Sequence, residues 1–133
     1  MVFVGGGAKP TLDLLGDSAA VGFLADRGSR AGWVCSVCTG SLLLGAAGLL
    51  RGYRAAGHWG AREILSQFGA KPSSERVCID RNRLTGGGVT AGVDFGIALA
   101  GRWAGDDVAR VIELLMEYAP QPPYGSGRPE LAD

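Results

Sequence analysis

Short apolar segments that alternate with longer segments of helical periodicity constrain the fold of this chain most strongly. Residues 1–4 are wholly apolar and residues 31–37 are nearly so, a pattern typical of strands buried on both faces of a parallel sheet. Between these segments, apolar residues recur at helical spacing from Thr11 to about Asp26, and Gly28 is a suitable helix end. The alternation predicts an α/β protein whose parallel sheet carries helices on both faces.

The rest of the chain continues this alternation within a single expected domain, residues 1–133. A helix at 39–50 is apolar on every side and is therefore expected to be buried. Because residue 1 opens directly on a buried-type strand, we expect the domain to lack an N-terminal portion. The further expected elements are helices at 62–68, 89–103 and 106–118, turn residues at 69–72, a hairpin of strands 76–79 and 83–85 around Asp80-Arg81-Asn82, and an extended tail at 120–133.

Charge and cysteine content narrow the classes of function. The 13 basic and 13 acidic residues give a formal net charge of zero, so the chain has no long-range attraction for nucleic acid or anionic lipid. Its apolar stretches are too short to cross a bilayer, and no basic start precedes an apolar signal region. Three cysteines do not make a disulfide framework. We therefore expect a cytoplasmic protein with a small-molecule or protein partner.

Cys38 is the residue that points most directly to chemistry. A predicted buried strand runs into it, and a predicted buried helix begins directly after it with Thr39-Gly40-Ser41. A helix N-terminus favours thiolate over thiol, and small residues permit a tight turn that projects the sulfur out of the sheet. Open parallel sheets bind ligands beyond the carboxyl ends of their strands, where Cys38 lies. The sequence favours a nucleophile, with a buried inert cysteine as the alternative.

Cys35 and Cys38 form a C-x-x-C pair, which raises zinc and redox-dithiol alternatives. A structural zinc site takes four ligands, whereas the chain supplies three cysteines and one histidine, with Cys78 in a separate strand. A redox pair has both cysteines at a helix start, whereas Cys35 lies inside the strand and faces away from Cys38. We therefore expect no metal, and we expect Cys35 and Cys78 to belong to the core.

His58 and two glycine clusters are the other candidate functional positions. An imidazole commonly moves protons for a thiolate, although a lone histidine in a loop is also a common turn residue. Gly5-Gly6-Gly7 and Gly86-Gly87-Gly88 each end a predicted strand, where glycine lets backbone amides approach a ligand. Lys9 follows the first cluster without the Gly-Lys-Ser/Thr ending of a phosphate-binding loop, so nucleotide binding is not favoured.

These motifs, taken in order, resemble the ThiJ/PfpI superfamily of class I glutamine-amidotransferase-like proteins. The match spans nearly the whole chain, and its closing segments narrow the resemblance toward the isonitrile hydratase branch. The segments that carry it are Val37-Cys38-Thr39-Gly40-Ser41, Ala47-Gly48-Leu49-Leu50-Arg51-Gly52-Tyr53-Arg54-Ala55, His58-Trp59, Thr85-Gly86-Gly87-Gly88-Val89-Thr90-Ala91-Gly92-Val93-Asp94, Glu117-Tyr118-Ala119-Pro120-Gln121-Pro122-Pro123-Tyr124 and Ser126-Gly127.

The resemblance implies a flavodoxin-like fold, a homodimer and hydration of an isonitrile to an N-substituted formamide without a cofactor. Cys38 would be the nucleophile on the turn, with Thr39 beside it as a second essential residue and His58 as a further catalytic candidate. Gly6 and Gly7 would line the substrate site, and the amides of Gly7 and Thr39 would be oxyanion-hole donors. The thiolate would add to the isonitrile carbon, and water would release the formamide.

Two departures from the family pattern affect these expectations. The family tends to carry hydroxyl residues just before His-Trp, whereas this chain has Ala56-Gly57. The family's catalytic acidic residue lies in a portion that precedes the segment matching Met1, and no residue of this chain corresponds to it. We therefore expect the chain by itself to be poorly active.

Three other functions remain open from the sequence. The same nucleophile would serve a hydrolase or glyoxalase-like enzyme acting on an amide, a peptide or a glyoxal. Related domains also form the sensor half of AraC-type transcription regulators, in which the cysteine need not be catalytic. Finally, an exposed and ionised Cys38 would suit a reversible redox sensor.

Overall fold

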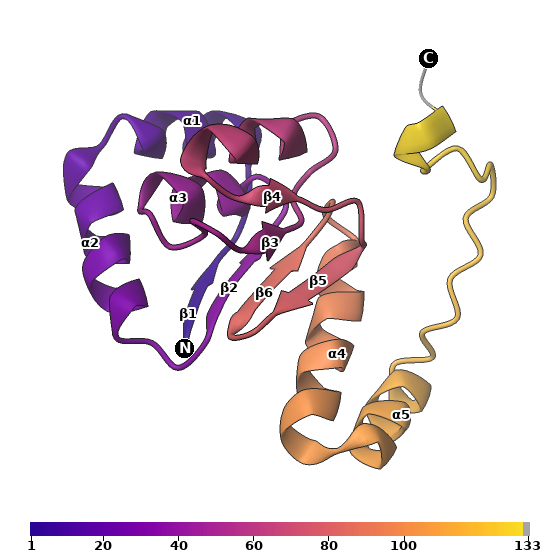
Figure 1. Ribbon diagram of the computed structural model, residues 1–133. Helices are drawn as coiled ribbons and strands as arrows, with labels where there is room; N and C mark the ends of the chain where they lie inside the picture. The colour runs from indigo at the N-terminus through magenta and orange to yellow at the C-terminus, as the bar shows by residue number, and fades with distance from the viewer. Residues whose placement is uncertain (132–133) are drawn as a thin grey trace. The chain divides into compact units, whose positions relative to one another are not determined.

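The computed structural model describes residues 1–131, which fall into two compact units, one from Met1 to Gly96 and one that begins at Ile97. Figure 1 shows the first unit as an α/β arrangement around a central sheet. Its strands are β1 (Val2–Val4), β2 (Val34–Val37), β3 (Arg54–Ala55), β4 (Lys71–Pro72), β5 (Val77–Asp80) and β6 (Arg83–Gly86). Its helices are α1 (Ala8–Leu15), α2 (Ser18–Ser29), α3 (Gly40–Ala46), the 3₁₀ helix η1 (Arg62–Phe68) and the start of α4 (Ala91–Ala104).

The central sheet has the strand order β1-β2-β6-β5. The first three strands are parallel, with Val2 opposite Val34 and Cys35 opposite Leu84. The fourth strand, β5, runs antiparallel to β6, because the predicted hairpin around Asp80-Arg81-Asn82 forms. The sheet is therefore mixed and mostly parallel rather than purely parallel. The carboxyl ends of β1, β2 and β6 meet at one edge, as the alternation of elements predicts.

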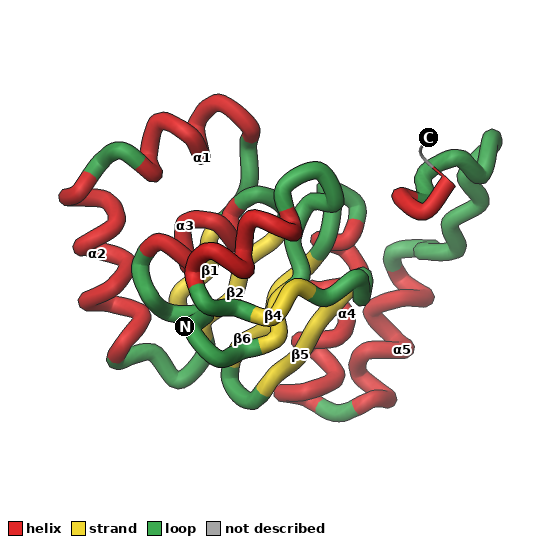
Figure 2. Tube along the Cα trace, turned by 45° about the horizontal axis from the view of Figure 1, so that its top comes forward, coloured by secondary structure: helices red, strands yellow, loops and turns green. Residues whose placement is uncertain are grey.

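Helices cover both faces of this sheet, as predicted. On one face, α1, α2 and α3 pack together (Figures 1 and 2), over a core that includes Val34, Leu44 and Leu65. Val4 packs against this core. Neighbouring strand residues point to opposite faces, and Phe3 contacts Phe95 of α4 with ring centroids 5.6 Å apart. The start of α4 therefore lies on the other face.

Several expected elements differ in extent from the structure, three of them in the part of the chain before Arg51. The helix predicted over Thr11 to Asp26 is two helices, because Asp17 caps α2 by accepting from the amides of Ala19 (2.9 Å) and Ala20 (3.1 Å). The helix predicted at 39–50 ends at Ala46, although Gly40 to Gly45 are buried as expected. The strand predicted at 31–37 begins at Val34.

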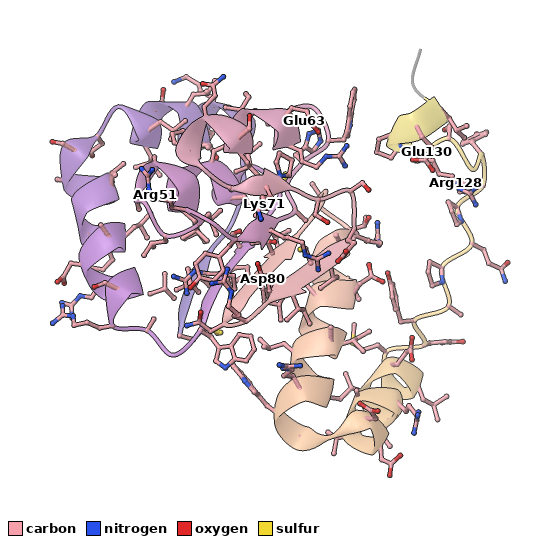
Figure 3. All side chains as sticks on the ribbon, viewed as in Figure 1. Arg51, Glu63, Lys71, Asp80, Arg128 and Glu130 are labelled. Carbon is pink, nitrogen blue, oxygen red and sulfur yellow. The ribbon has the colours of Figure 1, made fainter. Side chains whose placement is uncertain are left out.

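A second, two-stranded sheet consists of β3 and β4; β4 lies within residues 69–72, which are predicted to be turn, and β3 is not predicted. This sheet is joined to β5 by Asp80 (Figure 3), whose carboxylate accepts from the Arg54 amide at 2.9 Å. The guanidinium of Arg81 and the Arg54 amide together lower the pKa of Asp80. Polar contacts therefore fix the junction of the two sheets.

The second unit contains the end of α4, α5 (Asp106–Leu115) and a short 3₁₀ helix, η2 (Pro129–Leu131). The helices expected at 89–103 and 106–118 are therefore present with shifted ends. The residues between α5 and η2 form no helix or strand. The expected tail covers 120–133, of which 132–133 lie outside the described residues. No helix within residues 1–131 has both the length and the apolarity needed to cross a bilayer.

Candidate active site

Cys38 lies on a sharp turn between β2 and α3 in a backbone conformation that is rare for a non-glycine residue. Its φ is 64°, and its amide donates to the carbonyl of Gly86 at 3.1 Å, which extends the β2–β6 ladder to the turn itself. Such a strained turn between a strand and a helix is typical of a nucleophile exposed above a sheet. Cys38 is partly exposed, in contrast to a cysteine sealed in the core.

Two glycines allow the backbone to close around this turn. A Cβ on Gly6 would lie 2.6 Å from Cys38 Cβ and 2.8 Å from the Thr39 nitrogen. A Cβ on Gly40 would lie 2.5 Å from the Val4 carbonyl oxygen. Neither distance is compatible with a side chain. The loop after β1 therefore approaches the Cys38 turn so closely that only glycine fits at Gly6 and Gly40.

Thr39 is tied to the loop after β1 by its hydroxyl group. The Gly7 amide donates to Thr39 Oγ1 at 2.9 Å. Thr39 Oγ1 also lies 2.9 Å from the hydroxyl of Thr11, a residue of α1 that is only 2% exposed. The Gly7 amide, predicted as an oxyanion donor, is thus already hydrogen-bonded to a side chain next to the thiol.

His58 lies on a loop that hydroxyl side chains anchor to the core. Ser41 Oγ donates to the Ala56 carbonyl at 2.6 Å, and the Ala56 amide donates to Thr85 Oγ1 at 2.8 Å. Ser36 Oγ lies 2.8 Å from Ser41 Oγ. The residues before His58 are Ala56 and Gly57, and the Ala56 backbone is held by hydroxyls from α3 and β6. His58 Nδ1 accepts from the Gly60 amide at 3.2 Å.

A cavity of about 460 Å³ opens at the carboxyl edge of the parallel strands. It brings together the predicted residues Gly6, Gly7, Cys38, Thr39 and His58. None of the described residues that line it carries a carboxylate, ammonium or guanidinium group, and its apolar walls come from Phe3, Ala8, Val37 and Val89. The cavity therefore suits a small, neutral and largely apolar ligand.

The other two thiols belong to the core, as the sequence predicts. Cys35 and Cys78 are free and fully buried. Burial raises the pKa of Cys35 to about 11, and burial also raises the pKa of Cys78. Within residues 1–131, no group of three or more Cys, His, Asp or Glu side chains is arranged to hold a metal ion.

Sequence reasoning missed several residues of the site. The sequence pattern marks Thr11 only as a helix start, and Phe3 and Val89 only as members of predicted elements, yet Thr11 contacts Thr39 and the other two line the cavity. Ser41 stands out in the sequence only as a small residue. These roles depend on contacts between distant segments, and nothing in the local sequence pattern indicates them.

A family profile and curated proteins both match this chain. The sequence profile of the DJ-1/PfpI family matches residues 1–101. An isonitrile hydratase of Pseudomonas putida is 47% identical over 128 residues, which are 96% of this chain and 55% of the hydratase. The HTH-type transcriptional regulator GbdR of Pseudomonas aeruginosa is 38% identical over 96 residues, which are 71% of this chain and 25% of the regulator.

Solved structures give the same result. A ThiJ/PfpI family protein from Pseudomonas syringae superimposes with a TM-score of 0.91 and 46% identity, covering 96% of this chain and 53% of that protein. DJ-1 of Schizosaccharomyces pombe shares the fold at 21% identity, with a TM-score of 0.71 over 89% of this chain and 62% of that protein. The chain spans about half the length of the P. putida hydratase and about half the length of the P. syringae protein. On the evidence of the profile match, the identity and the shared fold, this chain belongs to the DJ-1/PfpI family.

Proposed function

We propose that this chain carries the nucleophile of an isonitrile hydratase, with Cys38 as the attacking thiol. The observation that carries the proposal is the left-handed conformation of Cys38 on the turn between β2 and α3, beside a cavity that Thr39 and His58 also line. The 47% identity to an isonitrile hydratase supports the choice of reaction within the family. The small, uncharged and largely apolar cavity supports a neutral substrate.

The proposed reaction proceeds through a covalent intermediate and is redox-neutral. The Cys38 thiolate adds to the isonitrile carbon, and the same carbon takes a proton, which gives a thioimidate. Water then adds to the C=N carbon, and the nitrogen takes a proton. The C–S bond breaks as the hydroxyl loses its proton and the C=O bond forms, so that the N-substituted formamide leaves and the thiolate is regenerated. This released proton balances the proton that the carbon took up in the first step. The overall reaction is isonitrile plus water to N-substituted formamide, and no cofactor takes part.

The residues around Cys38 have distinct proposed parts in this sequence. The Thr39 amide is the proposed donor for negative charge on oxygen, which develops as the hydroxyl of the tetrahedral intermediate gives up its proton. The Gly7 amide donates to Thr39 Oγ1. His58 is the proposed proton carrier, because its ring lines the same cavity as Cys38. Phe3 and Val89 are the proposed contacts of the apolar N-substituent.

Incubation with an alkyl isonitrile tests the proposal. We expect mass spectrometry to detect the N-substituted formamide and a Cys38 adduct, and we expect both to be lost in Cys38→Ser. The isonitrile hydratase of Pseudomonas putida serves as the positive control for the assay. A product formed at the same rate by Cys38→Ser would contradict the proposal.

A sensor domain is a second candidate, favoured by the match to the regulator GbdR. In that case the cavity binds a small molecule without turnover. Isothermal titration with candidate ligands separates the two functions: a sensor would bind its ligand equally well in wild type and in Cys38→Ala, and it would leave the ligand unchanged.

We further propose that the protein acts as a homodimer in the cytoplasm. The cytoplasmic assignment rests on three cysteines that are all free. The dimer rests on the family resemblance. Sedimentation equilibrium measures the mass directly, and a monomer over the micromolar range would contradict the dimer. Fractionation of cells that express the natural gene tests the compartment.

A further inference from the structure

The hydroxyl of Thr39 has two protein partners, and their nature fixes the direction of its own hydrogen. A threonine hydroxyl offers one hydrogen and two lone pairs. The Gly7 amide is a donor only, so its 2.9 Å contact with Thr39 Oγ1 occupies one lone pair. The second contact is with Thr11 Oγ1, also at 2.9 Å. The distance alone does not say which of the two hydroxyls donates.

The burial of the two threonines resolves this ambiguity. Thr11 is 2% exposed, and within the described part of the chain Thr39 Oγ1 is the one hydrogen-bond partner of its hydroxyl. A buried hydroxyl hydrogen without an acceptor is unfavourable, so Thr11 must donate to Thr39. Thr39 lines the cavity, so its own hydrogen can reach a bound ligand there.

We propose that Thr11 is a positioning residue that, with the Gly7 amide, occupies both lone pairs of Thr39 Oγ1 and thereby directs the Thr39 hydroxyl hydrogen into the cavity beside Cys38. The Gly7 amide then acts through Thr39, and the Thr39 hydroxyl is the donor that meets negative charge on the substrate. This inference rests on the proposed function, because it assumes that Cys38 is the attacking group.

Two reactions of the same thiol separate this role from a structural one. Acylation by p-nitrophenyl acetate forms a C–S bond, places the carbonyl electron pair on oxygen as an oxyanion, and then expels p-nitrophenolate. Alkylation by iodoacetamide forms a C–S bond as iodide leaves, and no oxyanion develops. A donor aimed at developing negative charge accelerates only the first reaction.

The experiment measures both rates in wild type, Thr11→Val, Thr11→Ser and Thr39→Val, with Cys38→Ser as the blank. We expect Thr39→Val to slow acylation about 100-fold and Thr11→Val to slow it about tenfold, with alkylation unchanged in both. Thr11→Ser keeps the hydroxyl and should restore acylation. Thr11→Val should have no further effect in a Thr39→Val background, because it acts through that hydroxyl.

Each other result overturns the inference. Acylation at the wild-type rate in Thr11→Val would remove the positioning role. A parallel loss of acylation and alkylation would show that the substitution disturbs the thiol itself. If Thr11→Val does not fold, Thr11→Ala repeats the measurement, because it removes the hydroxyl and adds no second methyl group. A wild-type Cys38 that is alkylated but never acylated would overturn this inference, whereas the proposed function fails separately if no formamide is formed from an alkyl isonitrile.

Discussion

Gly6 is the position at which a single methyl group disturbs the site most directly. Its Cα faces the Cys38 turn, so an added Cβ would overlap both the Cβ of Cys38 and the Thr39 nitrogen. A Cβ on Gly5, the preceding residue, would meet no atom within 4 Å. The two neighbours therefore form a matched pair, in which only one substitution has a steric consequence.

We expect Gly6→Ala to reduce acylation of Cys38 more than tenfold and to destabilise the fold by about 1–3 kcal/mol, because the loop after β1 must move away from the turn. Gly5→Ala should change neither quantity appreciably. Burst kinetics with p-nitrophenyl acetate and urea denaturation measure the two effects. Wild-type behaviour in Gly6→Ala would refute the close approach of the loop to the turn.

The buried thiol of Cys35 makes the free energy of unfolding depend on pH in the alkaline range. Burial raises the pKa of this thiol from 9.0 to about 11, so it stays protonated in the folded protein over a range in which it ionises in the unfolded chain. The stabilisation is complete below pH 9 and is lost as the pH rises through about 11. Its full extent is on the order of 2 kcal/mol.

Urea unfolding across this pH range tests the coupling. We expect the free energy of unfolding to fall more steeply above pH 9 in wild type than in Cys35→Ala, because the variant lacks the titrating group. The difference between the two curves isolates Cys35 from the other groups that ionise in this range. Parallel curves would mean that the thiol is not protected from ionisation.

At the scale of elements, Asp17 decides that the N-terminal helical segment is two helices. Its carboxylate accepts from two amides at the start of α2, which otherwise have no partner in the helix. Asp13, on α1, forms only an exposed pair with Lys9. The two carboxylates are close in sequence and differ in what they stabilise.

We expect Asp17→Ala to lower the free energy of unfolding by about 1 kcal/mol, the usual effect of removing an N-cap. Asp17→Asn keeps an acceptor oxygen and should cost much less. Asp13→Ala should cost less than about 0.5 kcal/mol, since exposed ion pairs contribute little. Chemical denaturation of the three variants provides the test, and equal losses in both alanine variants would contradict the cap.

At the scale of the whole molecule, the buried thiols of β2 and β5 report on the integrity of the central sheet. Cys35 and Cys78 have no exposed surface, so a thiol reagent reaches them only when the sheet opens. We expect brief labelling in increasing denaturant to modify both at one midpoint, while Cys38 reacts throughout. Labelling of Cys78 well before Cys35 would show instead that β5 detaches from the sheet.

Local patterns in the sequence predicted the strands well and the long-range contacts poorly. Continuous apolar runs predicted β1 and β2, and the turn residues Asp80-Arg81-Asn82 predicted the β5–β6 hairpin. The break at Asp17 was missed because apolar periodicity continues across it. The strands β3 and β4 contain two residues each and exist only because segments distant in sequence pair with each other. The same reason hides the contact of Thr11 with Thr39, which are separated by 28 positions.

The anchoring of the His58 loop has a consequence for how a ligand is received. Both backbone groups of Ala56 are held by hydroxyls of the sheet and of α3, and Arg76 binds Thr90 (2.9 Å) and Asp94 (2.5 Å) on the segment that follows β6. These bonds form within the protein alone, so the His58 loop is held in place without a ligand. If the cavity receives a ligand as proposed, this preorganisation would leave little ordering entropy to be lost by the loop on association.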